Sequence, residues 1–247
     1  MLKEALFSVS FSICNIIIIT FAYMNDNNSL KIEITADGSA TILVENLDEH
    51  YHSVKGALTE SLHIYRDCAF VHRAKSPFHA PLRLLEVGFG TGLNAVVTAM
   101  FANADAPVHY ITLEKFPLKL DFVKQLHYGD CIDKQLFDAI HAAEWNKPIA
   151  ITPYFTIEKR HCDYTVDPLP TDIDVVYFDA FAPEKQPDMW STQCFDRLVS
   201  SMNNDAVLTT YCAKGEIRRT LQASGLTVER LAGPVGGKRE IIRATKP

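Results

Sequence analysis

The sequence predicts an α/β fold, Rossmann-like, built on a mainly parallel sheet with helices on both faces. Three observations support this fold class. Strand-like apolar runs alternate with helical patterns from Leu82 onward. The apolar run at 83–88 leads directly into a glycine-rich turn, as a ligand-binding strand of such a sheet does. The segment 232–238, which joins the last two strand-like runs, is too short for a helical crossover, so those strands must form an antiparallel hairpin.

The elements of the main domain follow from this alternation. Seven strands are expected, at 83–88, 108–113, 152–158, 174–179, 206–212, 227–232 and 239–244. Helices are expected near 92–103, 117–127, 134–145, 190–202 and 215–224. The domain therefore covers residues 82–247.

A small appendage of residues 25–81 is expected to precede the main domain. Leu30–Ile34 and Thr41–Val44 flank a turn-forming segment and predict a hairpin. Residues 53–68 have helical spacing of apolar residues, with Ser53 as the expected N-cap. Pro77 and Pro81 then end the appendage.

Residues 1–24 are apolar through Ile16–Ile19, but serines dilute the run, and Met24 opens a polar stretch typical of a protein N-terminus. We expect Met24 to be the natural start and the preceding segment to be a start-site artefact. The alternative is a hydrophobic leader. No membrane association is expected.

Composition limits the function classes. The 247 residues are 47% hydrophobic and 22% charged, with six scattered cysteines that form no C-x-x-C pair, which predicts reduced thiols and a cytoplasmic protein. The nine histidines are dispersed, so no metal site is expected. The net charge is −6, yet Lys214–Pro247 carries eight lysines and arginines against three glutamates. That basic end could meet an RNA backbone or could be ordinary solvated surface.

The glycine turn is the most informative motif. Gly88, Gly90 and Gly92 follow the first strand, but position 93 is Leu, so the G-x-G-x-x-G pattern of dinucleotide-binding proteins is incomplete. With Glu86 before the turn, the pattern resembles the cofactor loop of S-adenosylmethionine (SAM)-dependent methyltransferases. An acid at the end of the second strand, Glu114, is placed to accept hydrogen bonds from a ribose, which SAM and NAD share.

The fourth strand carries the candidate chemistry. Asp179 lies at its carboxyl end, where open α/β sheets hold their ligands. Phe181 and Pro183 follow at once and could form the rim of a site. Trp190, a few residues later, is expected to pack in the core.

Four segments together resemble the methyltransferase module of the tRNA-modifying MnmC family and its stand-alone MnmD form. These segments are 85–94, 114–117, 178–183 with 187–190, and 237–240, and the resemblance extends from about Tyr51 to the C-terminus. It implies a class I methyltransferase with a seven-stranded sheet that uses SAM to methylate 5-aminomethyl-(2-thio)uridine at wobble position 34 of tRNA. Because the chain ends at Pro247 with no FAD-dependent oxidase module, we expect the stand-alone type.

The resemblance also assigns residues. The residues expected at the cofactor are Glu86, Gly88, Phe89, Gly90, Thr91, Gly92, Asn94, Glu114, Lys115, Asp163 and Asp179. Those expected at the substrate, the anticodon loop of tRNA, are Phe181, Pro183, Lys238, Arg239, Tyr51, Ser53 and Glu60.

Two of these roles have alternatives. Asp179 is the expected catalytic residue, which either removes a proton from the amine or only positions the ligands, because a carboxylate also stabilises an ammonium ion. Asp163 either meets the adenine amino group or caps its loop.

Three other functions remain open at this stage. The chain could be a SAM-dependent N-methyltransferase that acts on a small amine or a protein. It could be a nucleotide-binding oxidoreductase, which Leu93 and the terminal hairpin disfavour. It could also be a non-catalytic RNA-binding module.

Overall fold

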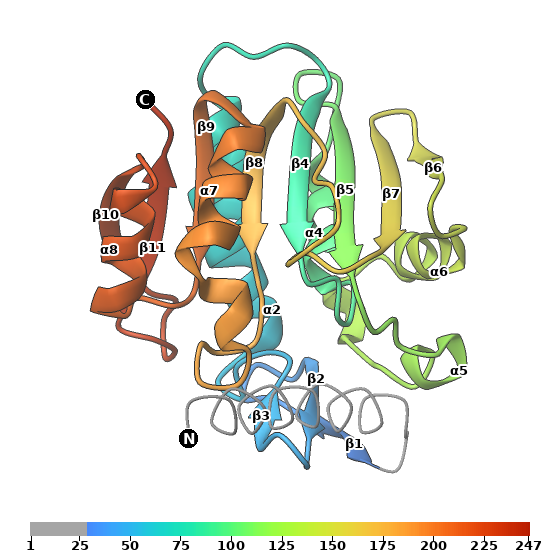
Figure 1. The fold of residues 1–247 in the computed structure, drawn as a ribbon. Helices are drawn as coiled ribbons and strands as arrows, with labels where there is room; N and C mark the ends of the chain where they lie inside the picture. The colour runs from blue at the N-terminus through green and yellow to red at the C-terminus, as the bar shows by residue number, and fades with distance from the viewer. Residues whose placement is uncertain (1–28) are drawn as a thin grey trace, which may run out of the picture.

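A computed structural model describes residues 29–247 (Figure 1). Within that range the main sheet has eight strands in the order β10-β11-β9-β8-β4-β5-β7-β6. The strands are β4 (Leu82–Val87), β5 (Val108–Glu114), β6 (Pro148–Thr152), β7 (Phe155–His161), β8 (Ile173–Phe178), β9 (Met202–Thr210), β10 (Thr227–Ala232) and β11 (Glu240–Thr245). The segment 1–24 and its expected start site lie outside the described residues.

The middle of the sheet is parallel and its two edges are antiparallel. β4 pairs in parallel with β5 and with β8, and the parallel pairs β5–β7 and β8–β9 extend the sheet on either side. β11 is antiparallel to both β10 and β9. The predicted class of sheet and its terminal hairpin are therefore confirmed.

The strand predicted at 152–158 is wrong in its first part. The chain turns at Pro153 and Tyr154, and the two sides of that turn are the antiparallel strands β6 and β7. Proline has no amide hydrogen for a strand ladder, so a continuous strand through Pro153 is disfavoured.

Helices cover both faces of the sheet (Figure 1). They are α4 (Leu93–Phe101), α5 (Leu120–Val123), α6 (Lys134–Ala142), α7 (Thr192–Ser201) and α8 (Gly215–Ala223). Successive β4 residues belong to different hydrophobic clusters: Leu84 packs with residues of α4 and α6, and Leu85 with residues of α7 and α8. Side chains alternate between the faces of a strand, so each face has its own core.

The N-terminal part forms a small sheet and one long helical segment. β1 (Leu30–Ile34) and β2 (Ala40–Val44) form the predicted hairpin, and β3 (Glu49–His50) pairs with β2. The helical segment consists of α2 (Ala57–Glu60), the π-helical η2 (Ser61–Val71) and α3 (His72–Ala74), and η2 packs against α4, β8 and β9. In Figure 1 the small sheet lies below the carboxyl ends of β4, β5 and β8.

The prediction of Ser53 as N-cap is wrong. The helix begins at Ala57. The cap position is Gly56, which has no side chain and so makes no capping hydrogen bond. Instead Asp37, in the turn of the β1–β2 hairpin, accepts hydrogen bonds from the amide (2.9 Å) and the hydroxyl (2.8 Å) of Thr59. A residue distant in sequence therefore takes the place of a local cap.

No helix within residues 29–247 is long and apolar enough to cross a membrane.

Candidate active site

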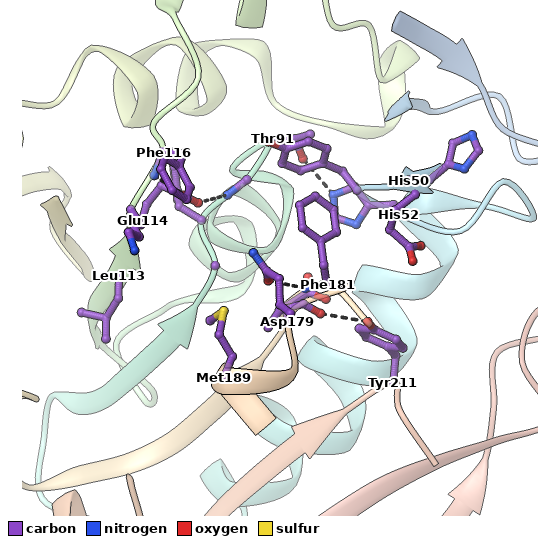
Figure 2. Close-up of a pocket in the computed structure, with 18 of the residues that line it drawn as sticks. His50, His52, Thr91, Leu113, Glu114, Phe116, Asp179, Phe181, Met189 and Tyr211 are labelled. Carbon is purple, nitrogen blue, oxygen red and sulfur yellow. Dashed lines mark hydrogen bonds between the residues drawn. The ribbon is translucent and has the colours of Figure 1, made fainter. Parts of the chain in front are cut away.

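A cavity of about 290 Å³ lies at the carboxyl ends of β4, β5 and β8. One wall comes from the main sheet and consists of Gly88–Thr91, Leu113–Phe116, Cys162–Tyr164 and Asp179–Phe181. The other wall consists of residues 49–54 and Glu60 of the N-terminal part, with Gln186, Met189, Tyr211 and Lys238. Figure 2 shows Glu114 and Phe116 at one end of this pocket and His50 and His52 at the other.

The glycine turn approaches its neighbours too closely for a side chain. Gly88 has φ 95°, and a Cβ atom there would lie 2.8 Å from the backbone oxygen of Asp179. Gly90 has φ 50°, and its Cβ would lie 2.8 Å from a ring carbon of Tyr51. Left-handed backbone and close contact both favour glycine at these positions. The turn therefore packs closely against Asp179 and Tyr51, and it also lines the cavity.

Glu114 is anchored to the glycine turn. Its two carboxylate oxygens accept hydrogen bonds from the amides of Gly90 (3.1 Å) and Phe116 (2.8 Å). The amide of Gly90, a residue predicted at the cofactor, thus donates to a protein carboxylate. Each carboxylate oxygen can accept a further bond, so Glu114 can still meet a ribose from the cavity wall.

Lys115 and Asp163 form an ion pair on the same wall. The ammonium of Lys115 lies 2.6 Å from one oxygen of Asp163, and the other oxygen accepts bonds from the amide and hydroxyl of Thr165. Burial opposes ionisation here, but these hydrogen bonds prevail and lower the pKa of Asp163. Asp163 thus caps its loop and also lines the cavity, so both interpretations of this residue stay compatible with its position.

Asp179 is fixed by two donors. Its Oδ1 accepts a hydrogen bond from the hydroxyl of Tyr65 at 2.6 Å, and its Oδ2 accepts one from the amide of Asn94 at 2.8 Å. Asn94 also donates to Glu86 at 3.1 Å and accepts from Ser61 at 2.6 Å. The orientation of the Asp179 carboxylate is therefore set by a buried network behind it.

Three residues predicted at the cofactor lie behind the cavity wall. Glu86 is fully buried and Asn94 is 3% exposed, and neither lines the cavity. Gly92 packs under Phe89 and His141, and a Cβ there would lie 2.8 Å from a ring nitrogen of His141. The reason is geometric: Glu86 follows the strand alternation into the sheet interior, and Gly92 turns the chain into α4. These residues support the site from behind.

Glu86 is unusual among the residues behind the cavity because its carboxyl group is fully buried and has no access to solvent. Burial raises its pKa to about 8. One of its oxygens accepts from Asn94, and the other has no hydrogen-bond partner within residues 29–247.

The N-terminal wall supplies aromatic and ionisable groups. Tyr51 meets Phe181 edge to face, with ring centroids 5.1 Å apart. The ring of His52 is joined to the hydroxyl of Thr91 at 2.8 Å (Figure 2). Glu60 is only 4% exposed, and burial, reinforced by the negative charge of Asp179, raises its pKa to about 7. Ser53 contacts Glu60 through its backbone amide, at 3.4 Å.

The structure separates two basic residues that the sequence placed together. The ammonium of Lys238 lies 3.5 Å from the ring centroid of Tyr211 and lines the cavity. Arg239, which is exposed like Lys238, does not line it. Pro183, also expected at the substrate, is half-buried outside the cavity wall. Lys238 therefore faces the reaction space, which leaves Arg239 as the candidate for a phosphate contact.

Trp190 is a core residue, as predicted. It is 4% exposed, packs edge to face on Phe178, and donates from its indole nitrogen to the backbone oxygen of Phe181 at 2.8 Å. It thereby holds the loop that carries Phe181.

Sequence reasoning missed His52, Tyr65 and Tyr211. Tyr65 has the helical spacing of a core residue, and its ring is indeed buried, so the sequence contained no signal for the contact between its hydroxyl and Asp179. Tyr211 follows β9 and was readable only as a strand end. Its hydroxyl donates to the backbone oxygen of Ala180 at 2.8 Å.

Residues 156–247 match a family described as S-adenosyl-L-methionine-dependent methyltransferase. The crystal structure of MnmC2 from Aquifex aeolicus superposes with a TM-score of 0.71 at 25% identity, covering 88% of this chain and 71% of that one. The fold is that of a class I SAM-dependent methyltransferase. Its cofactor is SAM, as the sequence predicted. The spermidine synthase of Thermotoga maritima shares the fold alone, at a TM-score of 0.57 and 12% identity.

Curated relatives place the chain near the MnmC methyltransferases. The bifunctional MnmC protein of tRNA 5-methylaminomethyl-2-thiouridine biosynthesis from Pseudoalteromonas atlantica is 30% identical over 236 residues, 85% of this chain and 32% of that protein. The protein of the same name from Cupriavidus necator is 29% identical over 213 residues, 80% of this chain and 32% of that protein. This chain spans about a third of the length of these relatives.

Proposed function

We propose that this protein transfers a methyl group from SAM to the aminomethyl nitrogen of 5-aminomethyl-(2-thio)uridine at wobble position 34 of tRNA. The product is 5-methylaminomethyl-(2-thio)uridine. The observation that carries the proposal is a cavity in which two carboxylates, Asp179 and Glu60, lie with aromatic rings against a glycine turn. Carboxylates attract an amine and aromatic rings stack on a base, so this cavity suits an aminomethylated nucleobase.

The wall from the main sheet fits SAM. Gly88 and Gly90 line the cavity and carry no side chain, so the turn presents backbone to a ligand there. The backbone of Gly88–Thr91 would hold the amino-acid part of the cofactor, with Phe89 beneath it, and Glu114 would accept the ribose hydroxyls. Lys115 and Asp163 would lie near the adenine. Bound SAM supplies an electrophilic methyl group on a sulfonium.

The opposite wall fits the substrate. Phe181 and Tyr51 offer ring surfaces on which a flipped-out uridine can stack. Asp179 and Glu60 would meet the aminomethyl group, and Ser53 would support Glu60. Arg239 would contact a phosphate of the anticodon loop, with Pro183 stiffening the rim nearby.

This function also fits a cytoplasmic protein, because mature tRNA is found there and the cysteines of residues 29–247 are free thiols. Residues 25–81 would act as the substrate-side appendage of a methyltransferase domain that begins at residue 82.

The test is methyl transfer from labelled SAM to tRNA isolated from cells that lack this protein. We expect label in the wobble uridine of aminomethylated tRNA, and none after RNase treatment of the substrate. Transfer to a free amine or to protein that survives RNase would replace the tRNA assignment with an N-methyltransferase of another substrate class. Nucleoside mass spectrometry of the mutant cells provides the second readout, because aminomethyl uridine should accumulate.

A further inference from the structure

Two of the carboxylates that line the cavity, Asp179 and Glu60, are held in opposite ways. Asp179 accepts a short hydrogen bond at each oxygen, from Tyr65 and from Asn94. Glu60 is buried at the end of α2 and accepts one long bond, 3.4 Å from the amide of Ser53. Both side chains line the same cavity. One carboxylate is thus clamped and the other is nearly free of donors.

The hydrogen bonds from Tyr65 and Asn94 suit Asp179 for orienting the amine of the substrate. Two donors fix the plane of its carboxylate, and Asn94 is itself fixed by Ser61 and Glu86. Two of its lone pairs are occupied, so those that remain can accept N–H bonds from an amine in a defined direction. Holding the nitrogen in line with the reacting methyl group contributes to rate without any proton transfer.

The surroundings of Glu60 suit proton transfer. The charged or titratable groups that face it are Asp179 beyond β8, Lys238 in the β10–β11 loop, Tyr65 in η2 and Tyr211 beyond β9. Burial and the charge of Asp179 oppose its ionisation, whereas Lys238 favours it, and the result is a pKa of about 7. A carboxyl group with a pKa near the working pH is an effective acceptor of protons.

The substrate requires such an acceptor. An alkyl ammonium has no lone pair, and an aminomethyl group is mostly protonated near neutral pH, so one N–H bond must break before nitrogen can attack a methyl group. We propose that Glu60 is the general base that takes this proton, while Asp179, positioned by Tyr65 and Asn94, orients the amine. This inference rests on the proposed function in that the substrate is an amine.

The N–H bond of the ammonium breaks, its electron pair stays on nitrogen, and the proton forms an O–H bond on the Glu60 carboxylate. The neutral nitrogen then forms the new C–N bond as the methyl group leaves sulfur, whose electron pair returns to it. Glu60 releases the proton to solvent after the product leaves.

The pH profile of methyl transfer tests this division of roles. In the wild-type enzyme we expect the single-turnover rate to fall below pH about 7, as Glu60 becomes protonated. Glu60→Gln should lower the rate at pH 7 by about 100-fold or more, the range of general-base effects. The loss should shrink at pH 9 to 10, where free amine forms without a base. Asp179→Asn should lower the rate by a similar factor on both sides of the inflection. The inflection should remain but move to lower pH, because the negative charge that helps to raise the pKa of Glu60 is removed.

Controls separate this proposal from a folding defect and from a wrong substrate. SAM affinity by calorimetry should be unchanged in Glu60→Gln, and Glu60→Asp should recover part of the rate. Glu33 does not line the cavity, although its partner His50 does, and Glu33→Gln should keep the wild-type profile. If Glu60→Gln keeps the inflection, or Asp179→Asn alone removes it, the assignment is overturned.

A wild-type enzyme that ignores tRNA but methylates another amine would refute the proposed function only. The same pH series on that amine would still decide the role of Glu60.

Discussion

The two walls of the cavity differ in how the chain builds them. The wall from the main sheet comes from the ends of three neighbouring strands, β4, β5 and β8, and includes the glycine turn with Gly88 and Gly90. The opposite wall gathers Tyr51, Glu60 and Lys238 from segments far apart in sequence. The first wall is a motif, and the second is an assembly of side chains. We infer that the first sets the cofactor and the second sets the substrate and its protonation.

The largest effect is expected from breaking the first wall. Gly88→Ala adds a Cβ 2.8 Å from the backbone oxygen of Asp179, which has no rotamer by which to move away. SAM affinity should fall on the order of 100-fold, because left-handed strain and a backbone clash displace the turn together. Isothermal titration calorimetry measures the dissociation constant of SAM for each variant. The matched control is Gly129→Ala, where φ is also positive (+64°) but a Cβ would meet nothing within 4 Å. An equal loss in both variants would point to general strain.

The next effect concerns the link between the walls. Tyr65→Phe removes one donor to Asp179, and a hydrogen bond to a charged group is worth about 1.5–3 kcal/mol, so kcat should fall about 10-fold or more. SAM affinity should not change. Tyr177→Phe is the control, since that buried hydroxyl lies 3.1 Å from the Thr98 hydroxyl and its ring is next to Tyr65. The idea of a positioning clamp fails if the two variants have the same kcat.

A smaller effect concerns the stability of the protein and depends on Glu86, which is buried behind the first wall. The pKa of Glu86 in the folded protein is about 8, above the ordinary value of 4.5. The folded chain therefore keeps a proton that the unfolded chain releases, and the free energy of unfolding should fall as pH rises from about 4.5 to 8.

Glu86→Gln keeps an acceptor for Asn94 without this proton. At pH 8 it should be more stable than wild type by about 1–3 kcal/mol, and less so at pH 5. Urea unfolding at both pH values measures the difference. In Glu86→Gln the free energy of unfolding should still fall somewhat as pH rises, because Glu60 also has a raised pKa. Glu216→Gln, on the exposed face of α8, should leave the pH dependence of the free energy of unfolding as it is in the wild type.

The smallest effect distinguishes the two basic neighbours of the second wall. Arg239→Met should weaken tRNA binding a few-fold and reduce the slope of log Kd against log salt by about 1, because it removes one phosphate contact. Lys238→Met should leave that slope unchanged, since Lys238 lies over Tyr211 in the cavity. Filter binding at several salt concentrations measures both. A reduced slope for Lys238→Met would return Lys238 to the phosphate-binding surface.

Most of the fold could be predicted from local sequence signals. The strand alternation, the glycine turn and the short link at 232–238 each act over a few residues, and they gave the parallel centre and antiparallel end of the sheet. The failures were also local. Pro153 was included in a strand that it ends, and Ser53 was preferred as a cap because Asp37 lies outside any short window.

The site could be predicted only in part. Glycine spacing and strand-end acids identified Gly88, Gly90, Glu114, Lys115, Asp163 and Asp179 on the cavity wall, because a strand end has a fixed place in a parallel sheet. The same pattern also predicted Glu86 and Asn94 at the cofactor, although neither lines the cavity. A sequence motif does not distinguish a residue that contacts the ligand from one that supports the site from behind.

What the sequence alone determined is the wall from the main sheet: the alternation of strands and helices, the glycine turn and the acids at strand ends follow from short-range signals. The tertiary structure decided the rest. It joined Tyr65 and Asn94 to Asp179 and buried Glu60 in the same cavity. It also placed Lys238 over Tyr211 at the cavity, whereas Arg239 does not line it. The physical reason is that protonation and orientation depend on burial and on neighbours brought together only when the chain is packed.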